Sequence, residues 1–80
     1  MTALLEQTVR RLIARRAGRP LAQVQPATRL LHDLNQDALD VFELILALER
    51  RFGVVIPDSA PLHTPADFVA CLRARPVPAP

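Results

Sequence analysis

Three segments carry apolar residues at helical spacing, and glycine or proline bounds each of them. This pattern predicts a first helix over 3–17, a second over 38–52 and a third from 65 to about 74. The apolar stripes are Leu5, Val9, Leu12 and Ile13; Val41, Leu44, Ile45, Leu48 and Phe52; and Phe68, Val69 and Leu72. A chain with three such stripes is expected to form a small all-α bundle, with its core where the stripes meet.

The starts of the second and third helices have clear capping signals. Asp37 precedes the second helix, and Asp40 follows in its first turn, three residues on. Thr64 precedes the third helix, with Pro65 at its first position and Asp67 at its third. Such residues satisfy backbone N–H groups that have no partner within the helix, so both starts are predicted to be sharply defined.

The connecting segments are expected to be mostly irregular. Residues 18–36 form a long first loop, with one helical turn expected near 21–24. Residues 54–56 are expected to be a packed extended link, and a short fourth helix is expected near 58–62. The domain is predicted to cover residues 1–75, and residues 76–80 are predicted to be a flexible proline-rich tail.

The size and composition of the chain limit what it can do. A chain of 80 residues builds one modest core and has no room for a deep active-site cleft. A single cysteine, Cys71, excludes an internal disulfide framework, and the His and Cys spacing matches no metal site. With no signal peptide and no long apolar run, the chain is expected to be a cytoplasmic, non-enzymatic protein that spans no membrane, with no catalytic residues.

Charge is segregated along the chain. All ten basic residues are arginine, and the formal net charge is +2. Residues 33–49, however, contain five acidic residues and no basic one: Asp33, Asp37, Asp40, Glu43 and Glu49. Leu39 and Leu46 fall on the flank of this acidic face, away from the core stripe. We interpret the segment as a surface for a basic partner, although solvated acids and ordinary exposed leucines would give the same pattern.

The central segment resembles the acyl carrier protein family. Its sequence Asp-Leu-Asn-Gln-Asp-Ala-Leu-Asp-Val-Phe-Glu-Leu over 33–44, followed by Ala-Leu-Glu at 47–49 and by Phe-Gly-Val-Val-Ile-Pro-Asp over 52–58, follows the family pattern. That pattern has Asp-Ser-Leu followed by an acid, then a Glu-Leu pair, a Phe and an Ile-Pro. The resemblance covers residues 28–72 and implies an acyl-carrier-like four-helix bundle with three longer helices, one short helix and a long first loop.

The resemblance also implies a function and a site. A serine at the start of the second helix would receive 4′-phosphopantetheine from a phosphopantetheinyl transferase. The arm would hold an acyl, aminoacyl or peptidyl thioester and present it to loading and condensing enzymes of fatty acid, polyketide or nonribosomal peptide biosynthesis. The attachment site would be marked by Asp37, Ala38 and Leu39. Partner recognition is assigned to Asp40, Glu43, Leu46 and Glu49.

Position 38 departs from the family pattern, because it is Ala rather than Ser. A methyl group has no nucleophilic oxygen, so no phosphodiester can form there. Two explanations remain open: the sequence is a Ser→Ala variant, or it is a natural pseudo-carrier that acts only as a docking module. The family pattern is kept on either side of position 38, at Asp37, Leu39 and Asp40. The pair Asn35-Gln36, however, stands where the family usually has a Gly-containing pair.

The arginines of the first helix allow a further alternative, a small nucleic-acid-binding domain. No aromatic residues for base stacking stand between Arg10, Arg11, Arg15, Arg16 and Arg19, and the positions of these arginines around the helix are spread. We therefore interpret them as solvated surface and expect a monomer that binds no nucleic acid.

Overall fold

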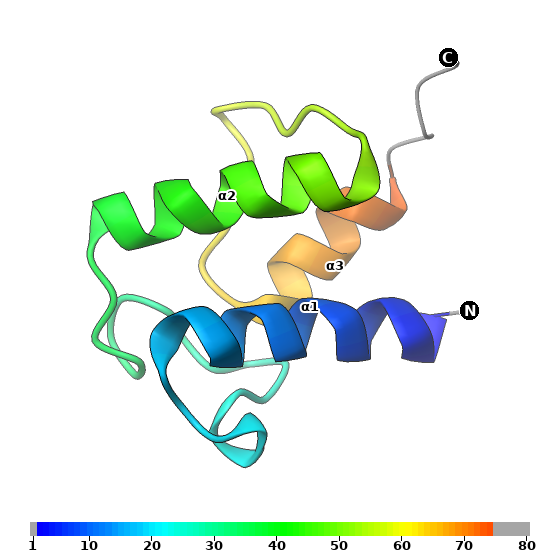
Figure 1. Cartoon of the computed structure of the whole chain (residues 1–80). Coiled ribbons are helices and arrows are strands. Elements are labelled where there is room, and N and C mark those ends of the chain that lie inside the picture. The colour runs from blue at the N-terminus through cyan, green and yellow to red at the C-terminus, as the bar shows by residue number, and fades with distance from the viewer. Residues whose placement is uncertain (1, 75–80) are drawn as a thin grey trace.

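The computed structural model describes residues 2–74 and shows an all-α chain. Its elements are α1 (Thr2–Ala17), the 3₁₀ helix η1 (Leu21–Gln23), α2 (Ala38–Phe52) and α3 (Pro65–Arg73). No strand occurs within 2–74. Figure 1 shows α1 and α2 running side by side in opposite directions, and α1 also packs against α3. The predicted all-α class and its three longer helices are confirmed.

The core forms where the predicted stripes meet. Its buried residues come from all three helices and from the loops between them: Val9, Ile13, Ala14, Val24, Leu30, Leu34, Leu44, Leu48, Val54, Ile56, Phe68, Val69 and Leu72. Leu5, Leu12, Val41, Ile45 and Phe52 are partly buried against this cluster. The expected link over 54–56 has no regular secondary structure and packs on the core, with Val54 and Ile56 buried and Val55 exposed between them.

Backbone and side-chain hydrogen bonds fix the long first loop against the helices. The guanidinium of Arg10 donates from Nε to the carbonyl of Val24 at 2.5 Å and from Nη2 to that of Leu21 at 3.3 Å. The N–H of Leu30 donates to the carbonyl of His63, and the N–H of Ala66 donates to that of Pro26, each at 3.0 Å. The helical turn expected near 21–24 is present as η1.

The short helix expected near 58–62 is not formed. A single turn stands there, closed by the N–H of Ala60 donating to the carbonyl of Pro57 at 3.1 Å. Pro61 explains the difference, because proline has no N–H to donate and disfavours helical geometry at the residue before it. The predicted tail over 76–80 and the last residue of the predicted domain, Arg75, lie outside the described residues.

Candidate functional site

The start of α2 is the feature that the motif singles out, and its own side chains shape it. The N–H of Asp40 donates to Oδ1 of Asp37 at 2.8 Å, and the N–H of Asp37 donates to Oδ2 of Asp40 at 3.0 Å. This reciprocal capping box satisfies two backbone donors and fixes where the helix begins. The predicted capping role of Asp37 is therefore confirmed, and residue 38 is the first residue of the helix.

The turn that precedes α2 sets the direction from which the chain enters the helix. Asn35 has a φ of 56°, in the left-handed region, which asparagine tolerates better than most non-glycine residues. The divergent Asn-Gln pair thus still allows the turn that a glycine would favour. Leu34 is buried beside it and anchors the turn to the core.

Asp33 stabilises the turn over 29–34. Its Oδ2 accepts a hydrogen bond from the N–H of Arg29 at 2.8 Å, and its Oδ1 lies 3.2 Å from Nδ1 of His32 and 3.6 Å from Nη2 of Arg29. The hydrogen bond from the backbone of Arg29, followed by that to His32, lowers the pKa of Asp33 below its ordinary value of 3.8. The carboxylate therefore keeps its charge at neutral pH.

The predicted site residues fall into two groups. Asp37, Ala38, Leu39, Glu43 and Leu46 are exposed, and Leu39 has 63% of its surface accessible. Asp40 and Glu49 are partly buried, and their carboxylates, like that of Asp37, accept hydrogen bonds from the backbone. Oδ2 of Asp40 belongs to the capping box, and Oε2 of Glu49 accepts the N–H of Ile56 at 2.7 Å. Glu49 therefore fastens the 54–57 link to α2, a structural role that the spacing along the helix did not predict.

Ala38 is one of the residues that line an apolar groove of about 360 Å³. Ala38, Leu46 and Glu49 lie along it, so the fold brings these three predicted residues together. The remaining residues along the groove come from the loops on either side and from α2: Leu31, Val41, Phe42, Ile45, Ile56, Pro57, Asp58, Ala60, Leu62 and His63. The first residue of α2 is thus part of the lining of this apolar groove.

Sequence reasoning missed Phe42 and Leu31 in this groove. Phe42 is 55% exposed and Leu31 is 52% exposed, although both are large and apolar. A signal for Phe42 was available, because it stands three residues after Leu39 and four before Leu46, which places all three on neighbouring turns of one helix face. Leu31 had no such signal, since its position depends on how the first loop folds over α2.

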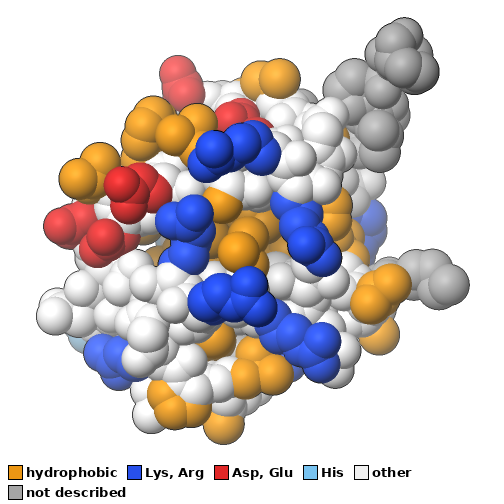
Figure 2. All heavy atoms as spheres, viewed as in Figure 1, with side chains coloured by type: hydrophobic (Ala, Val, Ile, Leu, Met, Phe, Trp, Pro, Cys, Tyr) orange, Lys and Arg blue, Asp and Glu red, His pale blue; other side chains and the backbone are white. Residues whose placement is uncertain are grey.

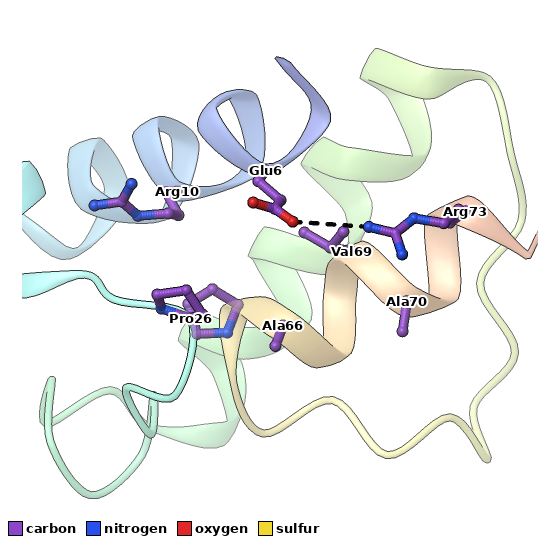
Figure 3. A pocket seen from close by; sticks show the side chains of 8 residues that line it. Glu6, Arg10, Pro26, Ala66, Val69, Ala70 and Arg73 are labelled. Carbon is purple, nitrogen blue, oxygen red and sulfur yellow. Dashed lines mark ion pairs between the residues drawn. The ribbon is translucent and has the colours of Figure 1, made fainter. Parts of the chain in front are cut away.

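A second hollow of about 230 Å³ lies between α1, α3 and the first loop. Figure 3 shows Glu6 and Arg73 facing each other across it, with Nη2 of Arg73 and Oε1 of Glu6 3.8 Å apart. None of the residues that line this hollow lines the groove at Ala38. The ion pair and the walls formed by Pro26 and Val69 belong to the packing of α1 against α3.

The arginines converge more than their positions around α1 predicted. Arg11 and Arg15 of α1 and Arg51 of α2 line one hollow between the helices, and Arg16 and Arg50 line another. Figure 2 shows basic side chains gathered where α1 and α2 lie side by side, with acidic ones near the start of α2. The tertiary fold thus brings Arg50 and Arg51 of α2 beside three arginines of α1, a grouping that the positions around α1 alone did not predict.

Two further findings concern residues 2–74. These residues contain no group of three or more His, Cys, Asp or Glu side chains placed to hold a metal ion. None of the helices among them is long and apolar enough to cross a membrane.

Comparison with known proteins identifies the motif. Residues 7–72 match the family model described as "Phosphopantetheine attachment site". The chain belongs to the acyl carrier protein family. It is 36% identical over 71 residues to an acyl carrier protein of Helicobacter hepaticus, covering 86% of this chain and 93% of that protein. It is 46% identical over 54 residues to an acyl carrier protein of Helicobacter pylori strain G27, covering 68% of this chain and 69% of that protein.

The cofactor of this family is 4′-phosphopantetheine. The residue at the motif position does not fit covalent attachment of that group. Ala38 is exposed at the start of a properly capped helix, so its position is suitable, but its side chain is a methyl group without an oxygen. Residue 38 therefore offers no oxygen to which the group could be joined.

Proposed function

We propose that this member of the acyl carrier protein family docks the enzymes that serve carrier domains but cannot itself be loaded with 4′-phosphopantetheine. The observation that supports this proposal is Ala38, exposed as the first residue of α2 inside an intact capping box. A carrier of this family would hold an acyl, aminoacyl or peptidyl group as a thioester. This chain keeps the shape of the carrier and lacks the one oxygen to which the arm is joined.

The docking surface that we propose consists of Leu39, Asp40, Glu43, Leu46 and Phe42, with Glu49 at the edge of the groove. The exposed charge of Glu43 would set the orientation and rate of encounter with a basic partner. The exposed side chains of Leu39, Phe42 and Leu46 would contribute the contact energy. The proposed partners are a phosphopantetheinyl transferase, for a chain with serine at position 38, and cytoplasmic loading and condensing enzymes.

Restoring the missing oxygen tests whether the surroundings are functional. The chain and its Ala38→Ser variant are each incubated with a phosphopantetheinyl transferase, Mg²⁺ and coenzyme A, and their intact masses are measured. The natural carrier of the same transferase serves as the positive control. We expect the variant to gain one phosphopantetheine group and the unchanged chain to gain none. A folded variant that stays unmodified would contradict the interpretation of this surface as that of a carrier.

The docking residues can be tested on the same Ala38→Ser background. Glu43→Arg and Leu46→Ala are each expected to lower kcat/KM for loading at least about fivefold, the loss of about 1 kcal/mol of contact energy. Leu4→Ala is the matched control, because Leu4 is 64% exposed on α1, outside the proposed surface. Equal kcat/KM values for all three variants would show that the docking surface is elsewhere.

The codon at position 38 of the encoding gene distinguishes the two origins of Ala38. An alanine codon identifies a natural pseudo-carrier, whereas a serine codon identifies this sequence as a Ser→Ala variant of a loadable carrier. Either result leaves the docking proposal to be tested by the loading kinetics.

A further inference from the structure

A basic face lies where α1 and α2 run side by side (Figure 2). It consists of five exposed arginines: Arg11, Arg15, Arg16, Arg50 and Arg51. Within residues 2–74 the side chains of these arginines make no ion pair and no hydrogen bond. Among the described residues, Glu43 is the one acid that lines the two hollows beside them. Five guanidinium groups thus stand against a single carboxylate.

The helix dipoles explain only part of this arrangement. Arg15 and Arg16 lie in the last turn of α1, and Arg50 and Arg51 lie in the last turn of α2, where a positive charge is favourable. The dipoles do not require the two groups to share one face, and like charges that are brought together repel each other. Acidic groups from a partner would relieve this repulsion.

The basic face continues from the proposed docking surface. Leu46 and Arg50 are four residues apart on neighbouring turns of α2, and Glu43 and Leu46 line the same hollow as Arg16 and Arg50. An enzyme that covers Glu43 and Leu46 therefore also lies over these two arginines. We propose that an enzyme docking on this chain, the transferase included, carries acidic side chains opposite the basic face. This inference rests on the proposed docking function and specifies the charge pattern of the partner.

Arginine is well suited to such a contact. Its planar guanidinium can donate two parallel N–H bonds to one carboxylate, and arginine is enriched at the cores of protein interfaces. The contact would decide which enzyme docks. An enzyme whose surface is basic throughout would be attracted to Glu43 but repelled by Arg16 and Arg50.

The surroundings of the arginines favour a protein over other anionic partners. A nucleic-acid backbone or an anionic membrane is negative throughout, so it would be repelled by the carboxylate of Glu43 in the hollow that Arg16 and Arg50 line. No described aromatic residue lines either hollow for base stacking. A protein surface can place a basic group opposite Glu43 and acidic groups opposite the arginines, so it fits the whole pattern.

Equilibrium binding to a phosphopantetheinyl transferase from the same genome tests this charge pattern. Because Ala38 accepts no phosphopantetheine, the complex cannot react, and its dissociation constant can be measured by isothermal titration calorimetry with coenzyme A and Mg²⁺ present. At low salt we expect Arg16→Glu and Arg50→Glu each to raise the dissociation constant at least about fivefold, and the effect should shrink at high salt. A transferase that is basic opposite these positions would bind both variants more tightly. Tighter or unchanged binding would overturn the proposal.

Arg73→Glu is the matched control, because it makes the same charge change on α3. It should leave the dissociation constant unchanged, and far-ultraviolet circular dichroism should show that every variant is folded. Arg11→Glu lies before the last turn of α1 and should also weaken binding. It tests the basic face if Arg16→Glu or Arg50→Glu does not fold.

Glu43→Arg separates this inference from the docking proposal. If Glu43→Arg alone weakens binding, docking stands and the acidic contact is overturned. If the arginine variants alone weaken it, the acidic contact stands and the role of Glu43 is contradicted. Absence of binding up to about 1 mM overturns both.

A short DNA duplex and vesicles that contain phosphatidylserine serve as the competing probes for the same variants. The proposal expects neither probe to depend on Arg16 and Arg50 more strongly than the transferase does. If the duplex or the vesicles lose binding in Arg16→Glu and Arg50→Glu while the transferase does not, the proposal is overturned. The basic face would then belong to nucleic acid or to lipid.

Discussion

The starts of α2 and α3 have the same capping chemistry in opposite surroundings. Asp37 and Asp40 form the box at α2, and Thr64 and Asp67 form the box at α3. At α3 the first residue, Pro65, and the fourth, Phe68, are buried in the core, and Phe68 is 0% exposed. At α2 both Ala38 and Leu39 are exposed. The same local device thus supports the core in one place and presents a surface in the other.

The hydrogen bonds around the two starts show the same contrast. Oδ2 of Asp67 accepts the N–H groups of both His63 and Thr64, at 2.9 and 3.1 Å, and the N–H of Ala66 reaches the first loop at Pro26. The start of α3 therefore joins two loops to the core. The box at α2 bonds only within itself, which leaves the first turn of α2 accessible to a partner.

The largest expected difference between the two regions is in side-chain burial. Phe68→Ala should lower the free energy of unfolding by about 3–5 kcal/mol, because it leaves a cavity in the core. Leu39→Ala, at an exposed position, should change it by less than about 0.5 kcal/mol. Urea unfolding followed by circular dichroism measures both. If Phe68→Ala does not fold, Phe68→Leu should still cost about 1 kcal/mol. Similar losses for the Phe68 and Leu39 variants would contradict the contrast.

Loss of either capping side chain should have a smaller effect. Thr64→Ala and Asp37→Ala each remove a cap of the kind that contributes about 1 kcal/mol. We expect the Thr64 variant to lose that amount in global unfolding, since the first turn of α3 is part of the core. The Asp37 variant should instead show faster amide hydrogen exchange over 38–41, with a smaller global loss. Suppose that both variants lose the same free energy of unfolding and that amide exchange over 38–41 does not change. The start of α2 would then be coupled to the core as tightly as the start of α3.

The smallest expected effect is the pH dependence contributed by Asp33, in the turn that leads into α2. Its pKa is lowered in the folded chain, so its charged form is stabilised by folding. This stabilisation is complete above the unfolded pKa near 3.8 and is lost as pH falls through the lower folded pKa. Asp33→Asn should therefore be less stable than the unchanged chain at neutral pH, and the difference should disappear in acid. If the stability difference between the two chains persists below the folded pKa, it would come from the shape of the side chain rather than from its charge.

The sequence predicted those helix starts and ends that depend on residues close together in the chain. The capping boxes involve residues three apart, so the starts of α2 and α3 could be read directly, as could the end of α2 at Gly53, whose φ is 65°. The short helix expected near 58–62 does not form, because Pro61 disfavours helical geometry at Ala60 and has no N–H to donate. A proline can thus prevent a helix even where other residues nearby favour one.

The sequence by itself determined the all-α class, the three core stripes and the absence of an oxygen at Ala38, because each follows from local spacing or from the identity of one side chain. The tertiary structure decided the rest of the site. It joined Glu49 to the N–H of Ile56, placed Leu31 along the groove and gathered arginines from α1 and α2 on one face. These features depend on distances between elements far apart in the chain, and those distances are set only when the core packs.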